Sequence, residues 1–266
     1  MREYDALDVT LSDGVLTIRL DRPDHLNAVN AALHEELTTV FRAAADSNAR
    51  VIVLTGAGEA FSAGGDIEEM HDRLDDPAAF RQTLREAQRI IEDILSVEQP
   101  IVAKVNGDAT GLGATLALFC DVVLMSEDAR LGDPHVQVAL VAGDGGAVVW
   151  PLLTSLNKAK ELLMTGDLIS ANEAEDLGLV NHAVPDDRLD ERTAEIVETL
   201  SSGPQAAIRY TKKTLNAWLE LGSTLALQRG LAFEGISQQH PDHDAAVNAF
   251  LEGESPTFPS ANGETK

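Results

Sequence analysis

The chain has 266 residues, of which 44% are hydrophobic, 4% aromatic and 24% charged, so it can bury a sizeable core as one large domain or a domain with a small appendage. It carries 44 Asp and Glu against 20 Lys and Arg, a net charge of -24, which disfavours a nucleic-acid partner because phosphate binding needs clustered basic residues. The N-terminal residues do not resemble a signal peptide, and no apolar run approaches the roughly 18 residues that a membrane-spanning helix needs. We therefore expect a soluble cytoplasmic protein without a membrane partner.

The negative charge is spread along the chain in acidic runs such as 66–76 and 171–178. Two interpretations stay open, a halophilic protein whose self-repulsion is screened by concentrated salt and an ordinary acidic cytosolic protein. Cys120 is the only cysteine, which excludes an internal disulfide and fits a small buried apolar residue in a reducing compartment.

The N-terminal half alternates short strands with helices. Residues 9–23 alternate apolar and polar side chains around Asp13-Gly14, which predicts a β-hairpin, followed by a helix over 27–47 and a strand over 49–58. A second round predicts a helix over 78–97, a strand over 100–107, a helix over 111–121 and a strand over 122–132. The expected fold class is therefore α/β, built from repeated ββα turns.

The C-terminal part changes character. Residues 159–185 predict a helix, a turn, a short helix and a strand, whereas 187–252 is almost entirely helical in pattern with one break at 201–205. We therefore divide the chain into a core over 1–200 and a C-terminal helical region over 201–266, whose last dozen residues we expect to be frayed.

Two glycine clusters can place backbone amides against a ligand. "GLGATLAL" (111–118) is a glycine turn that leads into a helix, and "SAGGD" (62–66) lets the backbone approach closely. Neither ends like a phosphate loop, and Leu116 replaces the third glycine of a dinucleotide fingerprint. Converging N–H groups could stabilise an oxyanion, while tight turns alone would explain either cluster taken singly.

Four segments, taken in order and spacing, resemble the crotonase superfamily of enoyl-CoA hydratases and isomerases. They are "DRPDHLNAVN" (21–30), "VIVLTGAGEAFSAGGDIEEM" (51–70), "PIVAKVNGDATGLGATLALFCDVVLMSEDARLG" (100–132) and "GLVNHAVP" (178–185). The resemblance implies a crotonase-like ββα spiral whose C-terminal helices pack a homotrimer, often doubled to a hexamer. It also implies an acyl-CoA substrate of the kind found in fatty acid metabolism, with coenzyme A as part of the substrate and no other cofactor or metal.

Carried over by position, the resemblance assigns the two oxyanion donors to the backbone of Gly65 and Leu112. It assigns substrate contacts to six further residues, which are Arg22, Ala63, Asp66, Ile67, Gly111 and Thr115. In the two-glutamate hydratases the catalytic carboxylates stand at the positions of Thr115 and His135, so both are missing here and the usual hydration mechanism is in doubt.

His135 can move a proton if a carboxylate holds its second ring nitrogen. If "HVQVAL" (135–140) is extended and the chain turns at Gly143, Asp144 can fold back to orient His135. This pair is similar to that of oxocamphor hydrolase, a superfamily member that cleaves a carbon–carbon bond of a β-diketone. A structural histidine and a turn-capping aspartate are the non-catalytic interpretations of the same residues.

The cofactor part of the substrate is a second question. Glu59 and Glu68 stand where relatives bring lysines to the CoA phosphates, and 249–254 lacks the family's C-terminal lysine. Either a salty environment removed those lysines or the substrate carries no CoA. "HPDHD" (240–244) has metal-like composition, but no third cluster supports a metal site.

The sequence thus predicts an enoyl-CoA hydratase/isomerase-type enzyme, a lyase in which Gly65 and Leu112 hold the thioester oxyanion and His135 with Asp144 handles water or a proton. Two alternatives remain open, a β-diketone hydrolase and a catalytically inactive family member kept as an assembly or binding subunit.

Overall fold

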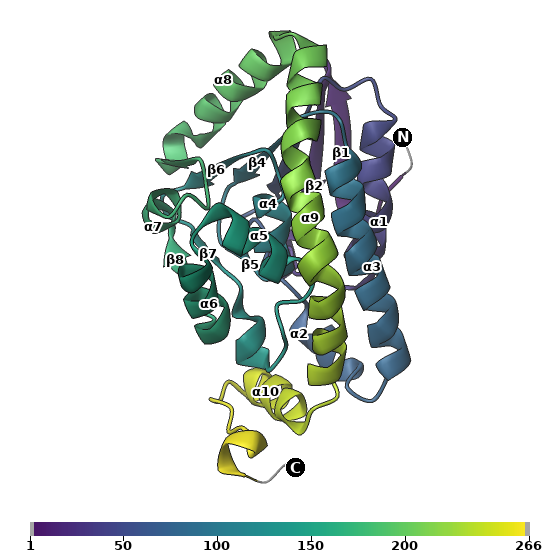
Figure 1. Cartoon of the computed structure of the whole chain (residues 1–266), viewed down its shortest axis with the longest axis vertical. Helices are drawn as coiled ribbons and strands as arrows, with labels where there is room; N and C mark the ends of the chain where they lie inside the picture. Colours follow the sequence, from purple (N-terminus) through teal and green to yellow (C-terminus); the bar gives the residue numbers. More distant parts are fainter. Residues whose placement is uncertain (1–2, 264–266) are drawn as a thin grey trace.

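The computed structural model of the chain describes residues 3–263 and confirms the mixed α/β class (Figure 1). A six-stranded sheet forms one layer, with neighbours in the order β1 (Leu7–Ser12), β2 (Val15–Leu20), β3 (Val51–Gly56), β4 (Ile101–Val105), β6 (Val122–Ser126) and β9 (His182–Val184). Within this sheet β1 and β2 pair antiparallel, and the other four pairings are parallel. A smaller sheet joins β5 (Ala109–Thr110), β7 (Arg130–Gly132) and β8 (Ile169–Ser170).

The predicted hairpin is confirmed as β1 and β2. Its two turn residues, Asp13 and Gly14, have φ angles of 52° and 83°, and a two-residue turn of this hand matches the twist of the flanking strands. The register pairs Leu7 with Leu20 and Ser12 with Val15, so the hairpin is closed along its whole length.

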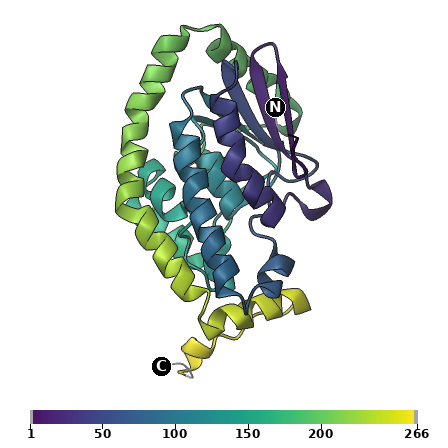
Figure 2. The ribbon, with the colours of Figure 1, turned by 90° about the vertical axis from the view of Figure 1, so that its right-hand side faces the viewer.

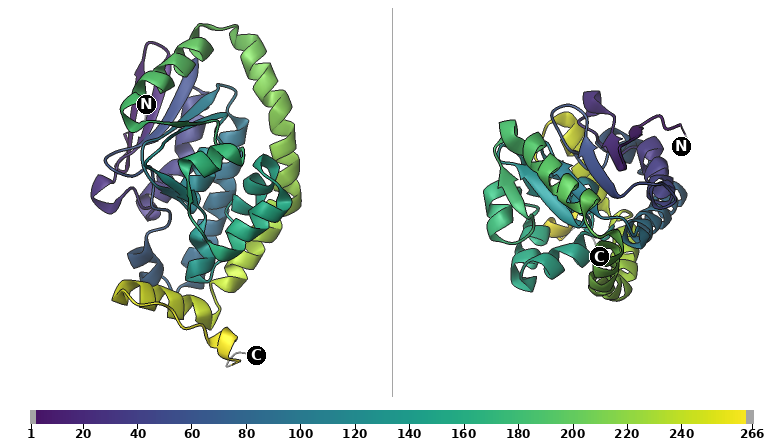
Figure 3. Two further views of the ribbon diagram at one scale, coloured as in Figure 1. Left: turned by 90° about the vertical axis from the view of Figure 1, so that its left-hand side faces the viewer. Right: turned by 90° about the horizontal axis from the view of Figure 1, so that it is seen from above.

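The main sheet is covered on both faces. In β3 every residue is buried: Ile52 and Leu54 belong to the large core, whereas Val51 and Val53 belong to a second apolar cluster. Such continuous burial is typical of a parallel strand between two layers of helices. The second cluster is completed by α8 (Leu189–Ser202), which packs on β3, β4 and β6 (Figure 3).

The other face of the sheet carries the helices that build the site. Helices α1 (Ala31–Ala45) and α3 (Pro77–Ser96) pack against each other, and the long α9 (Gln205–Ser237) lies against α3 and α5 (Gly146–Leu153) (Figure 2). The remaining helices are α2 (Ile67–Asp72), α4 (Leu112–Leu118), α6 (Leu156–Thr165), α7 (Ala171–Asp176) and α10 (Pro241–Glu252), with 3-10 turns η1 (Pro23–His25), η2 (Pro134–Val138), η3 (Asp186–Arg188) and η4 (Pro259–Asn262). Among the described residues no helix combines the length and the apolar character that crossing a membrane would require.

Three expectations need correction. The predicted strand over 122–132 is two strands, β6 and β7, that belong to different sheets. Residues 134–138 form the 3-10 turn η2 instead of an extended segment, because Asp133 caps the turn and Pro134 occupies its first position. Part of the last dozen residues is ordered, since η4 is tied to α10 by the amide of Ser260, which donates to Asp242 at 2.9 Å.

The boundary placed between residues 200 and 201 falls in the last turn of α8, and α9 begins at Gln205 after the Gly203-Pro204 break. A second break at 238–240 separates α9 from α10, which the sequence pattern did not reveal. Whether 201–266 acts as a separate unit stays a prediction.

A buried lysine anchors α9 to the core. Lys212 is 8% exposed, and its Nζ lies 2.7 Å from Asp121 Oδ2 and donates to the carbonyl of Gln99 at 2.8 Å. Burial raises the pKa of Asp121, and the nearby Lys212 opposes that rise. We expect Lys212→Met to lower the free energy of unfolding by about 3 kcal/mol, near the lower end for breaking a buried pair, because Asp121 keeps a fifth of its side chain exposed.

Denaturant titration of this variant in concentrated salt measures the effect. Lys213→Met is the matched control, since Lys213 on the same helix is exposed and pairs with Glu98 at 3.3 Å; we expect its free energy of unfolding to change by about 0.5 kcal/mol or less. Equal losses in both variants would contradict the anchoring role.

Candidate active site

Two backbone amides border one small cavity. Gly65 precedes α2, and Leu112 is the first residue of α4, where N–H groups have no partner inside the helix. Neither N–H has an acceptor among the described residues. Both residues line the same cavity of about 100 Å³, so the two predicted donors are brought to one place. Free amides at a helix start are suited to an oxygen that gains negative charge.

The flexible end of the Met70 side chain lies close to the backbone of Gly65. A Cβ there would lie 2.2 Å from Cε of Met70, so the side chain of Met70 covers this part of the backbone. Gly111, which precedes the second donor, has φ 53° and donates its N–H to the carbonyl of Gly132 at 3.0 Å. That bond joins the start of α4 to the strand that leads into His135.

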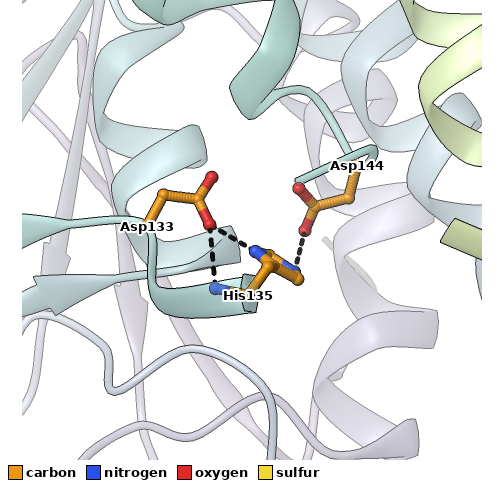
Figure 4. A group of neighbouring side chains, drawn as sticks. All are labelled: Asp133, His135 and Asp144. Carbon is orange, nitrogen blue, oxygen red and sulfur yellow. Dashed lines mark hydrogen bonds and ion pairs between the residues drawn. The ribbon is translucent and has the colours of Figure 1, made fainter. Parts of the chain in front are cut away.

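The imidazole of His135 lies between two aspartates (Figure 4). Its Nδ1 makes a short hydrogen bond to Oδ1 of Asp133, and its Nε2 lies 3.5 Å from Oδ2 of Asp144. Asp133 and Asp144 are 1% and 6% exposed. An imidazole held at both nitrogens by buried carboxylates has a fixed ring orientation.

This geometry differs from the expected one. Asp144 does lie beside His135, but at Nε2, whereas the contact that orients Nδ1 comes from Asp133. The sequence interpretation missed Asp133 because it treated the segment after it as extended. The Asp-Pro pair at 133–134 was the available signal, since an aspartate followed by proline is typical of the start of a helical turn.

Glu234 of α9 is, after Asp133, the second carboxyl group of the site that the sequence interpretation missed. It is 5% exposed and lines the small cavity together with His135 and Asp144. Its helix reaches the site because Gly143 and Gly230 touch: a Cβ on Gly143 would lie 2.4 Å from the carbonyl oxygen of Gly230. Position 234 lies 90 residues beyond Asp144, and no local pattern connects them.

Burial and mutual charge set the protonation of this cluster. Burial alone would lower the pKa of His135, but Asp133, Asp144 and Glu234 together outweigh it and raise that pKa well above its ordinary value. Burial raises the pKa of Glu234 strongly, and Asp144 adds to the rise. Burial also raises the pKa of Asp144, although His135 opposes it. Both shifts favour the charged imidazolium form of His135 and the protonated form of Glu234.

Three buried carboxylate oxygens have no hydrogen-bond partner among the described residues, namely Oδ2 of Asp133, Oδ1 of Asp144 and Oε2 of Glu234. Unpaired buried polar atoms are rare in native proteins and concentrate where chemistry takes place or water is held. Together with the imidazolium they form an acid–base cluster next to two free amides.

The raised pKa of Glu234 predicts a pH-dependent stability. Above the ordinary glutamate pKa of 4.5 the unfolded chain releases a proton that the native state keeps, so native stability falls as pH rises through this window. In Glu234→Gln this contribution is absent, and we expect the variant to gain stability relative to the wild type between pH 5 and pH 8. Denaturant unfolding at both pH values measures the gain.

Glu220→Gln is the matched control, because Glu220 lies on the same helix and is exposed. We expect its difference from the wild type to be independent of pH. A Glu234→Gln difference that stays constant or shrinks from pH 5 to pH 8 would contradict the protonated state of Glu234.

A larger cavity of about 530 Å³ adjoins the small one and shares Gly65, Met70 and His135 with it. Ala63, Ile67 and Gly111 line this large cavity, and Asp66 lines the small one. Four of the six residues assigned to substrate contact therefore border the two cavities.

The other two do not. Arg22 pairs with Asp66 at 3.2 Å and lies outside both linings. Thr115 is fully buried behind Gly145, its hydroxyl has no partner among the described residues, and it too is absent from both linings. A substrate contact of Arg22 or Thr115 therefore stays a prediction that neither cavity lining supports.

Asp133, His135 and Asp144 also carry potential metal-ligand atoms within 4.8 Å of one another. The two carboxylates contact different nitrogens of the ring, Asp133 at Nδ1 and Asp144 at Nε2. This arrangement suits a clamped imidazole better than a common ion.

The chain is similar to known proteins along almost its whole length. The sequence profile of the family described as enoyl-CoA hydratase/isomerase matches residues 10–261. A protein of Rhodobacter capsulatus described as a probable enoyl-CoA hydratase is 35% identical over 258 residues, covering 96% of this chain and 98% of that protein.

Two solved structures are close in shape. An enoyl-CoA hydratase/isomerase from Mycobacterium paratuberculosis has a TM-score of 0.89 and 38% identity, covering 93% of this chain and 99% of that one. A β-diketone hydrolase from the cyanobacterium Anabaena, bound to (S)-3-oxocyclohexyl acetic acid, has a TM-score of 0.82 and 30% identity, covering 89% of this chain and 95% of that one.

Proposed function

Because the chain belongs to the enoyl-CoA hydratase/isomerase family of the crotonase superfamily, we propose that it is an enzyme that adds water to an enoyl thioester of coenzyme A. The observation that carries this proposal is one small cavity bordered by two free amides and by the His135 cluster. The amides of Gly65 and Leu112 hold the thioester oxygen as it becomes an enolate oxygen.

The acid–base work is divided between the two sides of the cluster. Asp144, whose pKa burial raises, accepts a proton from a water molecule as the water oxygen bonds to C3 of the enoyl group. The electron pair of the C2–C3 double bond moves toward the thioester, and the imidazolium of His135 donates its proton to C2. Proton exchange between Asp144 and Nε2 of His135, which lie 3.5 Å apart, restores the starting state. This pair replaces the two glutamates that the sequence lacks.

A second candidate is hydrolysis of a β-diketone. Of the residues that line the large cavity none is Lys or Arg, and Glu254 is acidic, so the lining offers the CoA phosphates no lysine or arginine partner. The structural similarity to a β-diketone hydrolase supports the same alternative. The same groups would serve: water adds to one carbonyl, the carbon–carbon bond breaks, and the enolate takes a proton from His135.

One experiment separates these candidates. The protein, purified in concentrated salt, is given crotonyl-CoA and cyclohexane-1,3-dione in separate assays, with loss of the conjugated absorbance and mass spectrometry as readouts. Turnover of the thioester supports the first candidate, and turnover of the diketone supports the second. No turnover of the diketone, of crotonyl-CoA or of a longer, oxygen-bearing enoyl-CoA would overturn both and favour a catalytically inactive member of the family.

We also propose that the chain assembles into a trimer or hexamer. Large apolar side chains stay exposed along α9 of the single chain, which is typical of an interface; they are Tyr210, Leu215, Trp218, Leu221, Leu225, Phe233 and Ile236. Light scattering in concentrated salt should give three or six times the chain mass of 28.4 kDa. A monomer at micromolar concentration would contradict this prediction.

A further inference from the structure

A second imidazole–carboxylate pair, separate from the His135 cluster, lies in the wall of the small cavity. His34 of α1 points its Nδ1 at Oε2 of Glu86 on α3, at 2.9 Å, across two helices that pack side by side (Figure 2). His34 is 7% exposed, and the side chain of Glu86 is 18% exposed. Both residues line the small cavity together with Gly65, Leu112 and His135.

The proton between the two side chains belongs to the histidine. The hydrogen bond from His34 lowers the pKa of Glu86 against the opposing effect of burial, so Glu86 is a carboxylate and accepts from Nδ1–H. Glu86 is further held by Gln82, whose Nε2 donates to Oε1 at 2.8 Å. The ring of His34 therefore has a fixed orientation and its Nδ1 is fully occupied.

Nε2 of His34 is the free end of this pair. It has no hydrogen-bond partner among the described residues, although its ring lies in the lining of the small cavity, which contains apolar side chains such as Phe80 and Leu84 as well as polar ones such as Thr83. A neutral ring held in this tautomer accepts at Nε2 from a hydroxyl, and a charged ring donates to a ketone oxygen. An alkyl group placed against Nε2 would leave it buried and unpaired.

We propose that His34, held by Glu86, binds an oxygen atom on the acyl part of the substrate, away from the carbonyl that Gly65 and Leu112 hold. The preferred substrate class is then an acyl group that carries a distal hydroxyl or ketone, and a plain hydrocarbon chain is a poor substrate. This inference rests on the proposed function, and it applies to its thioester and diketone forms alike.

The effect should be large enough to measure. A site built to hydrogen-bond a substrate oxygen discriminates against the analogue that lacks it, because the protein group is left unpaired. We expect kcat/KM to be about ten- to a hundredfold higher for the oxygenated substrate than for the matched hydrocarbon.

The test compares 2-hexenoyl-CoA with 5-hydroxy-2-hexenoyl-CoA and 5-oxo-2-hexenoyl-CoA. Wild type, His34→Leu and His34→Gln are assayed. The double variant His34→Leu/Glu86→Leu is included in case His34→Leu alone folds poorly, because it leaves no unpaired carboxylate. His182→Leu is the matched control, since His182 faces Glu175 at 3.8 Å on the partly exposed edge strand β9, outside the lining of both cavities. Far-UV circular dichroism and thermal unfolding check that each variant folds.

The expected result is a wild-type preference for one oxygenated substrate that both leucine variants lose, mainly through KM, while 2-hexenoyl-CoA is still converted. His34→Gln should keep part of the preference, because its amide can still hydrogen-bond, and His182→Leu should keep all of it. The hydroxy and oxo substrates distinguish which oxygen function is bound.

An equal kcat/KM of the wild type for all three thioesters would overturn the inference and leave the proposed function intact. So would a preference that survives in both leucine variants. If no thioester is converted, the proposed hydration fails by itself, and calorimetric binding of 5-hydroxyhexanoyl-CoA, 5-oxohexanoyl-CoA and hexanoyl-CoA decides the role of His34 by the same comparison of affinities.

Discussion

Leu112→Pro should lower kcat by about 10²–10³-fold relative to Leu112→Ala, because proline removes one of the two backbone donors that hold the substrate oxyanion. Leu112 is the first residue of α4, and proline is tolerated at that position because its fixed φ fits and the N–H makes no helical bond. Steady-state kinetics with whichever substrate the wild type converts measures the loss.

Leu112→Ala is the matched control because it removes the same buried side chain but keeps the N–H. Both variants should lose stability through the truncated core contact, and their free energies of unfolding should agree to within about 1 kcal/mol. If the proline and alanine variants have the same kcat, the amide of Leu112 does not hold the oxyanion, and the central element of the proposed mechanism is wrong.

His135→Gln should lower kcat by about 10²–10⁴-fold, the usual contribution of a positioned acid or base. Glutamine can occupy the space between Asp133 and Asp144 and can hydrogen-bond, but it carries no transferable proton at physiological pH. In the wild type, the activity should decline as pH rises through the raised pKa of His135, because the imidazolium is the proton donor.

His182→Gln is the control for this prediction, since it changes a second histidine that faces a carboxylate but lies outside both cavities. Its kcat and its pH profile should equal those of the wild type. A His135→Gln enzyme that keeps its kcat, or that keeps the alkaline decline, would remove His135 from the reaction.

Local signals in the sequence were enough to predict most of the fold. The dipeptide Asp13-Gly14 is a strong signal for a two-residue hairpin turn, because both residues tolerate a positive φ. The structure has the hairpin at this place. The apolar run at 49–58 predicts β3, because a strand buried on both faces must be apolar throughout. Residues 122–132 were misjudged because the pattern of one long strand does not distinguish it from two short strands joined by a turn.

The candidate site was only partly predictable, for a physical reason. Glycine clusters in the sequence indicate where backbone amides can be free, so the two oxyanion donors could be assigned to Gly65 and Leu112. The structure places both residues at one cavity. Partners of His135 depend on tertiary packing instead. Asp133 meets the ring only because η2 bends the chain, and Glu234 arrives on a helix that no local pattern connects with residue 135.

The touching backbones of Gly143 and Gly230 make α9 a part of the reaction centre as well as of the outer surface. One side of this helix presents the carboxyl group of Glu234 to the small cavity, and other positions along it present exposed aromatic and aliphatic groups to the outside. With no side chain between the loop and the helix to absorb a displacement, any force that slides α9 along its axis also displaces Asp144. The turnover rate should therefore change when the outer face of α9 is contacted or displaced, although that face is distant from the reacting atoms.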